Sequence, residues 1–514
     1  MFLDANTAEA GAFERGWDVC VVGTGPAGMT VARRLAAQGH DVALMEAGDL
    51  EVTWESQDFY EGEIAGMAYY DLDICRLRTF GGTSQHWGGR CRALEAYNFE
   101  PLPFYPLSGW PISKADLDPY VEETDFILDL IPASALPDEP VEDGLGDLVD
   151  IRFRQSAPTR FADKYGDEIR ASERITLIYN AALVDLRLSE QGGAVTGAVF
   201  RPGRPEGTNF EVWARFYCLC LGGLENPRFL LNANSQMPAG IGNKYDLVGR
   251  YFCEHPTYRI ADVLFEGRIP QSNGYMPTFE AMKRHEMLSF NLLLAARGDS
   301  LSRAATRSLA CSSDFTQRLA ERVLGRKVDC TRDGFLATLE AQRSGADRTG
   351  KLGIILEQQL NPDSRVMLGD EVDAFGQRRM VLDWRLSERD IHTIRSAAEI
   401  MGRSLAARGY GRLKMRDWLR AEPAGVPQMG EEGDHQVAIC HHLCTTRMSA
   451  DPREGVVDAD CRVHGIDNLH LGGSSVFATA GFANPTYTIV QMALRLGDRL
   501  DTRLAGARVS DTAG

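Results

Sequence analysis

The chain has 514 residues, of which 44% are hydrophobic and 25% are charged, a composition that can bury a large core and does not indicate disorder. Its formal net charge of −17 argues against nucleic acid or an anionic membrane as the main partner, because the long-range field would repel both. The charge therefore favours a neutral or cationic small molecule as the substrate over a polyanion.

The chain has no run of about 18 uncharged apolar residues, so no transmembrane helix is expected. Residues 1–16 lack the basic and apolar regions of a secretion signal, and we expect a cytoplasmic protein. The eleven cysteines follow no framework spacing, and Cys20, Cys218 and Cys220 lie in apolar runs, which predicts buried free thiols. The cysteines and histidines at 440–444 lack the second ligand pair of a structural zinc site, so no metal is expected.

Residues 17–49 follow the order strand, glycine turn, helix and strand that makes a dinucleotide-binding βαβ unit. Gly23, Gly25 and Gly28 have the spacing G-x-G-x-x-G. The first glycine permits the tight turn, the second lets the backbone approach a pyrophosphate, and the third lets the helix pack closely on the strand. The pyrophosphate would then lie at the positive end of the helix dipole.

Glu46 ends the second strand of this unit, where an acidic side chain can bind ribose hydroxyls. This position favours FAD or NAD over NADP. The short distance from the N-terminus and the sequence Glu46-Ala47-Gly48 favour FAD as a resident cofactor, which Glu46 and Ala47 are expected to contact.

Residues 79–89 form a second informative stretch, because four glycines exclude a regular element and leave backbone N–H groups free to line a cofactor. Together with the βαβ unit, this stretch resembles the glucose-methanol-choline (GMC) oxidoreductases, FAD enzymes in which a glycine-rich loop lies along the flavin. The resemblance implies FAD contacts from Gly82, Thr83, Ser84, His86, Trp87 and Gly88.

The Ser-x-His-Trp form of this loop is similar to that of the pyranose 2-oxidase branch of the family, in which the loop histidine is covalently attached to the flavin. His86 is the matching residue. A histidine that only hydrogen-bonds to the cofactor is the alternative, because similar loops in related bacterial enzymes need not make the bond.

The C-terminal region carries a form of the family's H-x-x-G-T-x-x-M block, whose first histidine is the general base. Here that residue is His441, with Thr445 and Met448 in register and Cys444 in place of the usual glycine. The resemblance places the partner of the base at Asn484. A histidine can take the hydroxyl proton of an alcohol near neutral pH, and an uncharged amide can donate to the developing alkoxide.

His442 is the rival for the base, but neighbouring residues of an extended segment face opposite ways, and the register of the block favours His441. Residues 249–256 resemble another family landmark, in which we expect a structural role for His255. The remaining predicted contacts are with the cofactor at Gly473, Ser474, Asn484, Pro485 and Thr486, and with the substrate at Gln358 and His442.

The resemblance implies an α/β fold, α+β overall, with a Rossmann-like FAD-binding domain and a substrate-binding domain built on an antiparallel sheet. Alternation at 287–293 and 353–359 fits strands of that sheet. Glycines near 340–352 could act as hinges of a lid. The expected domains are both discontinuous, with the FAD-binding domain at 1–105, 176–260 and 436–514 and the substrate-binding domain at 106–175 and 261–435.

These features predict FAD-dependent oxidation of a secondary hydroxyl of a sugar or glycoside, at C2 or C3 of a pyranose, to a ketone. Electrons would pass to O2 or to a quinone-type acceptor. Two alternatives stay open from the resemblance. The chain could be the catalytic subunit of a cytochrome-linked sugar or alcohol dehydrogenase, which would use oxygen poorly. It could also be an FAD-containing lyase, whose flavin would not be reduced by substrate.

Overall fold

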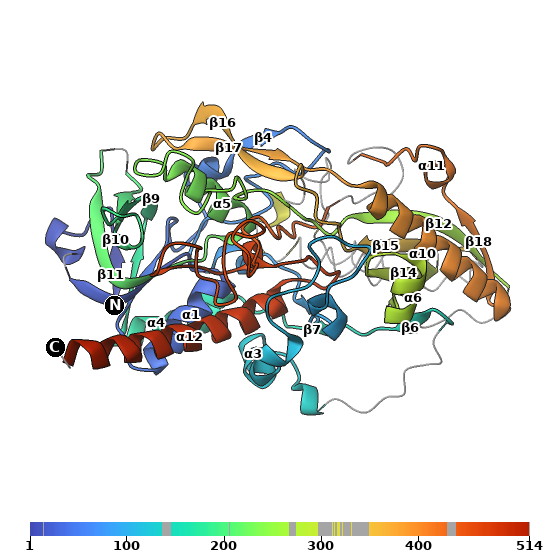
Figure 1. Ribbon diagram of the computed structural model, residues 1–514, viewed down its shortest axis with the longest axis horizontal. Helices are drawn as coiled ribbons and strands as arrows, with labels where there is room; N and C mark the ends of the chain where they lie inside the picture. The colour runs from blue at the N-terminus through green and yellow to red at the C-terminus, as the bar shows by residue number, and fades with distance from the viewer. Residues whose placement is uncertain are drawn as a thin grey trace.

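The computed structural model describes seven long stretches of the chain and a few residues between them. These are residues 1–13, 15–135, 145–204, 206–266, 274–296, 349–428 and 438–512, together with 311, 313, 316–318, 321 and 330. The molecule is elongated, with one large sheet at each end (Figure 1). Among the described residues, no helix combines the length and apolar character needed to span a bilayer.

The first sheet contains the predicted βαβ unit and is mostly parallel. Its strands are β1 (Phe2–Asp4), β2 (Gly16–Val22), β3 (Val42–Met45), β8 (Ile175–Tyr179), β9 (Ala181–Leu188), β10 (Val195–Pro202), β11 (Phe210–Leu219) and β19 (Leu469–Leu471). Their order is β1-β8-β3-β2-β11-β10-β9, with β19 also paired to β11. The pairs from β1 to β11 are parallel, whereas β9 and β10 add an antiparallel arm. The Rossmann-like fold class is confirmed.

Helices cover both large sheets, and two of those on the first sheet contact each other although they come from opposite ends of the sequence. The described helices are α1 (Pro26–Ala37), α2 (Trp54–Gln57), α3 (Val121–Ile127), α4 (Phe161–Ala171), α5 (Gly222–Asn232), α6 (Phe279–His285), α10 (Glu388–Ala407), α11 (Asp417–Arg420) and α12 (Thr486–Thr512). α12 runs beside α1 (Figure 1), where Arg34 Nε lies 2.7 Å from Asp498 Oδ1. A Cβ on Gly497 would lie 2.7 Å from Arg34 Cγ, so a glycine permits this approach.

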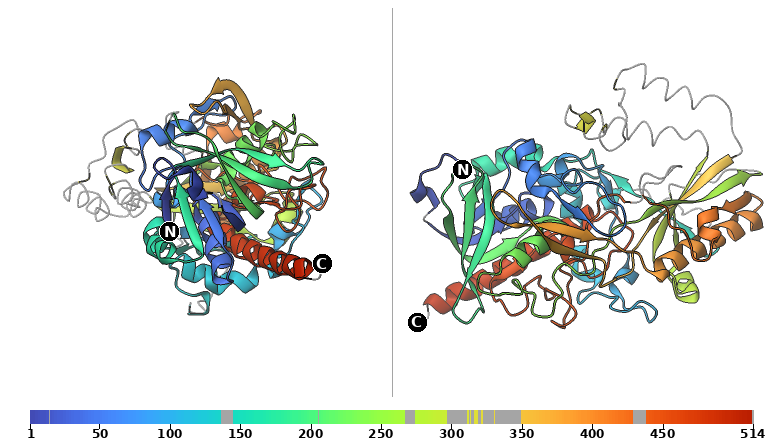
Figure 2. Two further views of the ribbon diagram at one scale, coloured as in Figure 1. Left: turned by 90° about the vertical axis from the view of Figure 1, so that its left-hand side faces the viewer. Right: turned by 90° about the horizontal axis from the view of Figure 1, so that it is seen from above.

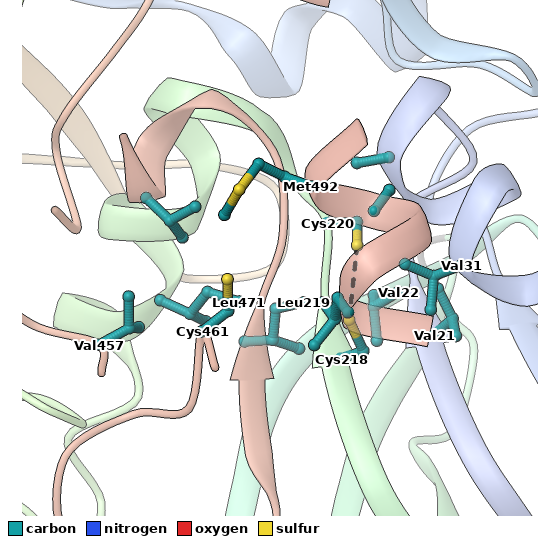
Figure 3. Packing of buried hydrophobic residues seen from close by; sticks show 14 of the residues in the cluster. Val21, Val22, Val31, Cys218, Leu219, Cys220, Val457, Cys461, Leu471 and Met492 are labelled. Carbon is teal, nitrogen blue, oxygen red and sulfur yellow. Dashed lines mark hydrogen bonds between the residues drawn. The ribbon is translucent and has the colours of Figure 1, made fainter. Parts of the chain in front are cut away.

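Buried apolar side chains and thiols fill the space between β2, β11, β19 and the helices (Figure 3). Cys218 and Cys220 lie in this core with their sulfurs 3.6 Å apart, and Cys461 lies nearby (Figure 3). The prediction of buried free thiols is confirmed for Cys20, Cys218 and Cys220. It is wrong for Cys311 and Cys330, which form a disulfide with a Cα–Cα distance of 5.6 Å.

The second large sheet is antiparallel, as expected for the substrate-binding domain. Its strands are β6 (Leu148–Asp150), β12 (Thr257–Phe265), β13 (Tyr275–Pro277), β14 (Phe290–Ala296), β15 (Thr349–Leu356) and β18 (Gly411–Met415). They follow the order β18-β12-β15-β14-β13-β6, and α10 packs on them to enclose a second hydrophobic core (Figure 2). The domain boundaries stay a prediction.

Two smaller sheets are separate from the large ones. Their strands are β4 (Gly62–Ile64), β16 (Arg365–Val372) and β17 (Arg378–Asp383) in one, and β5 (Arg90–Cys91) and β7 (Arg154–Gln155) in the other. The expected lid near 340–352 lies mostly outside the described residues. Gly350, one of the glycines of that range, belongs to β15, which pairs with both β12 and β14. A Cβ there would lie 2.7 Å from the Phe265 ring, so this glycine serves strand packing, and the lid stays a prediction.

Candidate active site

A cavity of about 460 Å³ opens at the carboxyl ends of β2, β3 and β11, where parallel strands commonly present a ligand site. Segments far apart in the sequence form its wall, from the βαβ unit to the start of α12. The predicted site residues that line it are Gly23, Gly25, Glu46, Ala47, Gly82, Thr83, Ser84, His86, Trp87, Gly88, His441, His442, Gly473, Ser474, Asn484, Pro485 and Thr486. Of the predicted residues, Gly28 and Gln358 lie outside this lining.

The three glycines of the βαβ unit have different steric surroundings. Gly23 has φ +102°, and a Cβ there would lie 2.5 Å from the carbonyl oxygen of Cys220. A Cβ on Gly28 would lie only 1.8 Å from the carbonyl oxygen of Gly23, so this glycine lets α1 pack against the turn. Around Gly25 no atom lies within 4 Å of such a Cβ, which would instead project into the cavity. The free space beside Gly25, at the N-terminus of α1, fits a pyrophosphate.

Glu46 joins the turn to the end of β3. Its Oε2 accepts hydrogen bonds from Thr24 Oγ1 at 2.5 Å and Thr24 N at 3.2 Å, and its Oε1 accepts one from Gly48 N at 2.8 Å. Burial raises the pKa of this carboxyl, and the hydrogen bonds oppose that shift. Thr24 Oγ1 also accepts from Gly81 N at 3.1 Å, which fixes the glycine-rich loop on the βαβ unit.

The glycine-rich loop lies along the cavity and contains the 3₁₀ turn Gly82–Gln85. Gly82 has φ +54°, and its Cβ position would lie 3.1 Å from Gly25 Cα. Arg160 Nη1 donates to the carbonyl oxygens of Ser84 and Trp87 at 2.8 and 3.1 Å, which holds the loop from outside.

His86 faces the cavity from this loop. Its Nδ1 is buried and makes no hydrogen bond within the chain. Burial, together with the nearby Arg160 cation, lowers the pKa of His86 to about 4, so the ring is neutral near pH 7. A neutral, buried and unpartnered ring nitrogen fits a cofactor that lies against the loop.

His441 and Asn484 meet at the cavity wall. His441 Nε2 lies 3.4 Å from Asn484 Nδ2, and the main-chain N–H of His441 donates to both carboxylate oxygens of Glu254 at 2.9 and 3.0 Å. On the other side of the ring, His441 Nδ1 lies 2.8 Å from His255 Nδ1. Burial, with smaller effects from His255 and His442, lowers the pKa of His441 well below its usual range. The ring is therefore a neutral base near pH 7.

His442 lies on the same wall but has different neighbours. Its ring centroid is 5.9 Å from that of Tyr69 and 6.1 Å from that of Phe252. Its carbonyl oxygen accepts from Ser474 Oγ at 2.6 Å, and a Cβ on Gly223 would lie 2.1 Å from that oxygen. The adjacent histidines thus meet separate groups, and only His441 contacts Asn484.

Cys444, which stands where the family's block has glycine, has a left-handed backbone conformation with φ +67°. Its main-chain N–H donates to the carbonyl oxygen of Ser474 at 3.1 Å, which joins the His441 block to the loop before α12. Gln358 is fully buried, and both ends of its amide are used inside the protein. Its Oε1 accepts from Trp384 Nε1 and Glu254 N, so we do not carry it forward as a substrate contact.

Sequence reasoning missed a group of buried charges on the cavity wall. Arg76 Nη1 lies 2.7 Å from Glu225 Oε1, and Arg228 Nη2 lies 2.6 Å from Asp373 Oδ2. These side chains line the cavity with Arg78. In the sequence, only Arg76 and Arg78, just before the glycine-rich loop, indicated charge at this wall. Nothing in the sequence identified their acidic partners.

Comparison with known proteins gives this geometry a family. Residues 18–224 match the sequence profile of FAD dependent oxidoreductases, and residues 361–493 match that of the GMC oxidoreductases. The chain therefore combines an FAD-dependent oxidoreductase domain with a GMC oxidoreductase C-terminal domain. FAD is accordingly the cofactor that the Gly25 space and the His86 loop fit.

Known relatives of the chain include two enzymes that are named as oxidases. The 6'''-hydroxyparomomycin C oxidase of Streptomyces lividus is 24% identical, over 98% of this chain and 94% of that protein. A C-glycoside 3-oxidase of Microbacterium trichothecenolyticum is 34% identical over 28% of this chain and 25% of that protein. The solved structure of a fungal aryl-alcohol oxidase has a TM-score of 0.57 at 15% identity, covering 95% of this chain and 99% of that one, and shows the shared fold.

Proposed function

We propose that this chain is a GMC oxidoreductase and oxidises a secondary hydroxyl of a sugar or glycoside, at C2 or C3 of a pyranose, to a ketone. The observation that carries the proposal is the contact between His441 Nε2 and Asn484 Nδ2 on the wall of the cavity that fits FAD. The names of the hydroxyparomomycin oxidase and the glycoside 3-oxidase support a carbohydrate substrate.

When bound, FAD supplies the hydride acceptor for the carbon that bears the hydroxyl group. His441 Nε2, which is neutral and exposed to the cavity, takes the hydroxyl proton. The Asn484 amide donates a hydrogen bond to the same oxygen as negative charge develops there, and it does not compete for the proton. Both side chains are half-buried in the cavity wall, which limits the water that can weaken these interactions.

The residues proposed to hold FAD belong to three segments of the cavity wall. The turn at Gly23–Gly25 and the N-terminus of α1 would bind the pyrophosphate, with Glu46 and Ala47 beside the ribose. Residues 82–88 would lie along the flavin. Gly473, Ser474 and the Asn484-Pro485-Thr486 start of α12 would complete the site with backbone donors.

Two kinds of contact between His86 and the flavin are possible, a covalent link or a hydrogen bond alone. The unpartnered Nδ1 of His86 is available to either. Acid denaturation followed by removal of the precipitate separates them. Flavin that stays with the protein in the wild type but not in His86→Ala supports the covalent link, whereas flavin entirely in the supernatant excludes it.

Anaerobic mixing of the holoenzyme with sugars, glycosides and simple alcohols tests the proposed substrate class. Loss of the oxidised-flavin absorbance with a pyranose or its glycoside supports the proposal, and NMR of the product then identifies the oxidised carbon. Reduction by simple alcohols alone would contradict it. Absence of reduction by every alcohol, with FAD bound, would favour the lyase alternative.

His441→Ala tests the proposed base. We expect flavin reduction to slow by about 10²- to 10⁴-fold, the usual contribution of a general base. FAD content per chain should stay near that of the wild type. His392→Ala is a matched control, because His392 lies on α10 and its Nε2 contacts the carbonyl oxygen of His285, outside the cavity lining. Substantial residual reduction in His441→Ala would contradict the assignment.

The electron acceptor is proposed to be O2 or a quinone-type molecule. Part of the sequence is similar to the large subunit of a fructose dehydrogenase of Gluconobacter japonicus, at 25% identity over 58% of this chain, which keeps the dehydrogenase alternative open. Reoxidation of the reduced enzyme by air and by a soluble quinone, followed by stopped flow, distinguishes these acceptors. Slow reaction with air and fast reaction with the quinone would favour a dehydrogenase.

A further inference from the structure

His255 lies directly behind His441, on the side of the ring opposite Asn484. The two Nδ1 atoms are 2.8 Å apart, and the rings are nearly perpendicular at 88°. A hydrogen bond between two imidazole nitrogens requires one to carry a proton and the other to offer a lone pair. The direction of this bond therefore fixes the tautomer of both rings.

Asn484 determines that direction. Its Nδ2 can only donate and lies 3.4 Å from His441 Nε2, so in this pairing Nε2 accepts and carries no proton. In the neutral ring the proton is then on His441 Nδ1, which donates to His255 Nδ1. The proton of neutral His255 is left on Nε2, where the carbonyls of Ala480 and Gly481 favour it although neither forms a well-aligned hydrogen bond.

Glu254 fixes the backbone of both histidines. Its carboxylate accepts the main-chain N–H of His255 at 2.7 Å and that of His441 at 2.9 Å. The Tyr69 hydroxyl also donates to it. Gln358 Oε1 accepts the main-chain N–H of Glu254 at 3.1 Å. The distance between the two rings is thus set by a buried network and does not depend on a ligand in the cavity.

We propose that His255 is a positioning residue that accepts the Nδ1–H of His441 and so keeps the Nε2 lone pair of His441 directed at the cavity. The inference rests on the proposed role of His441 as the base. When His441 Nε2 takes the proton of the substrate, the ring becomes a cation and its hydrogen bond to His255 strengthens.

His255 suits this role because it stays neutral. It is fully buried, and burial lowers the pKa of its ring to about 4. A charged His255 would lose the lone pair at Nδ1 and would repel the imidazolium of His441. The titratable groups nearest to the two histidines are His442, which acts on His441, and Glu254, which contacts their main-chain N–H groups. The arrangement gives the base an oriented partner without placing a carboxylate against its ring.

Two substitutions separate this role from simple packing. His255→Phe keeps a ring in the buried space but offers no acceptor, whereas His255→Asn can offer Oδ1 near the position of Nδ1. We expect His255→Phe to slow flavin reduction by about 10²-fold or more, within the range of a general base, and His255→Asn to keep most of the rate. FAD content should stay unchanged in both. Equal loss in the two variants, or no loss in His255→Phe, would overturn the proposal.

A double-mutant cycle tests whether His255 acts through His441. In the His441→Ala background, His255→Phe should cause no further loss, because the lone pair that it positions is already gone. A multiplicative loss would instead indicate an independent role for His255. His464→Phe is the control, since its Nε2 contacts the carbonyl oxygen of Ser449, outside the cavity lining, and the rate should not change.

The tautomer itself can be observed without turnover. The chain has ten histidines, so ¹⁵N NMR of holoenzyme with ¹⁵N-labelled histidine is feasible, with His441 assigned by its loss in His441→Ala. The wild type should show protonated Nδ1 and unprotonated Nε2, and His255→Phe should move the proton toward Nε2. An unchanged tautomer in His255→Phe would overturn the proposal. This result stands even if no alcohol reduces the flavin, so it separates failure here from failure of the proposed function.

Discussion

The surroundings of His441 predict an unusual pH dependence. Burial and two neighbouring histidines lower its pKa well below the ordinary range, so the ring stays unprotonated as the pH falls through 6.5. A general base works in its unprotonated form, and the rate of flavin reduction at low substrate concentration should therefore stay constant from pH 8 to below about 6, past the ordinary histidine pKa. Stopped-flow reduction at a series of pH values measures this.

An inflection near the ordinary histidine pKa would contradict this reading. Glu254 is the carboxyl nearest the main chain of His441, and burial raises its pKa above the ordinary value. Its protonation at low pH would loosen the backbone of His441. Glu254→Gln removes the carboxylate at every pH. This variant should therefore show at every pH the lowered activity that the wild type shows only at low pH.

At the scale of single elements, the turn between β2 and α1 gives a matched pair of substitutions. Gly25→Val should fold and lose FAD, because its Cβ position is free of protein atoms within 4 Å and its side chain would enter the cavity. Gly28→Ala should destabilise the fold by about 1–3 kcal/mol, because its Cβ would overlap the carbonyl oxygen of Gly23. Flavin content per chain and urea unfolding of each variant check both outcomes.

Gly16→Ala serves as the control for this pair, since no atom lies within 4 Å of its Cβ position at the start of β2. It should keep both FAD and stability. Full flavin content in Gly25→Val would show that the pyrophosphate does not lie beside this residue. Wild-type stability of Gly28→Ala would show that α1 can move away from the turn at little cost.

α5 begins earlier than the sequence predicts, because a contact with a distant segment allows it. The sequence suggests a helix that begins near Arg228, after Asn226 and Pro227, but α5 begins at Gly222 and contains Pro227. Proline lacks the N–H that would bond to the carbonyl four residues earlier, which is that of Gly223. Thr445 Oγ1 donates to this carbonyl at 2.6 Å instead. A threonine of the His441 block thus lets the helix start early and pins that block to α5.

At the scale of the whole molecule, FAD should stabilise the fold far beyond the βαβ unit. The cavity wall is built from the first sheet, the β16–β17 hairpin, α5 and the start of α12. A ligand that binds only the folded state adds about 2.7 kcal/mol when its concentration is about 100 times its Kd. Removal of FAD should therefore lower the thermal midpoint, and reconstitution should raise it with increasing FAD.

Differential scanning fluorimetry of deflavinated protein with added FAD measures this shift, with Gly25→Val as the variant that should not respond. A midpoint that is independent of FAD in the wild type would contradict a single site that joins these elements. Limited proteolysis should show the same protection at segments on both sides of the cavity.

The sequence by itself determined the parts of the protein in which local spacing dictates structure. The βαβ unit, the glycine-rich loop and the family resemblance follow from glycines at fixed intervals, since glycine fits the close approach at Gly28 and the left-handed backbone at Gly82. Alternation predicted the antiparallel sheet that contains β14 and β15, because side chains in a strand point to opposite faces in turn.

Tertiary structure alone decided which buried groups meet. The start of α5 and the prediction of free thiols at Cys311 and Cys330 were wrong, because each depends on a partner elsewhere in the chain. His255 had no visible chemistry in the sequence, since hydrogen bonds between residues 186 positions apart leave no local pattern. The order of the residues determines short-range steric contacts. The tautomer and pKa of His441, in contrast, arise from a desolvated environment that exists only after the chain has folded.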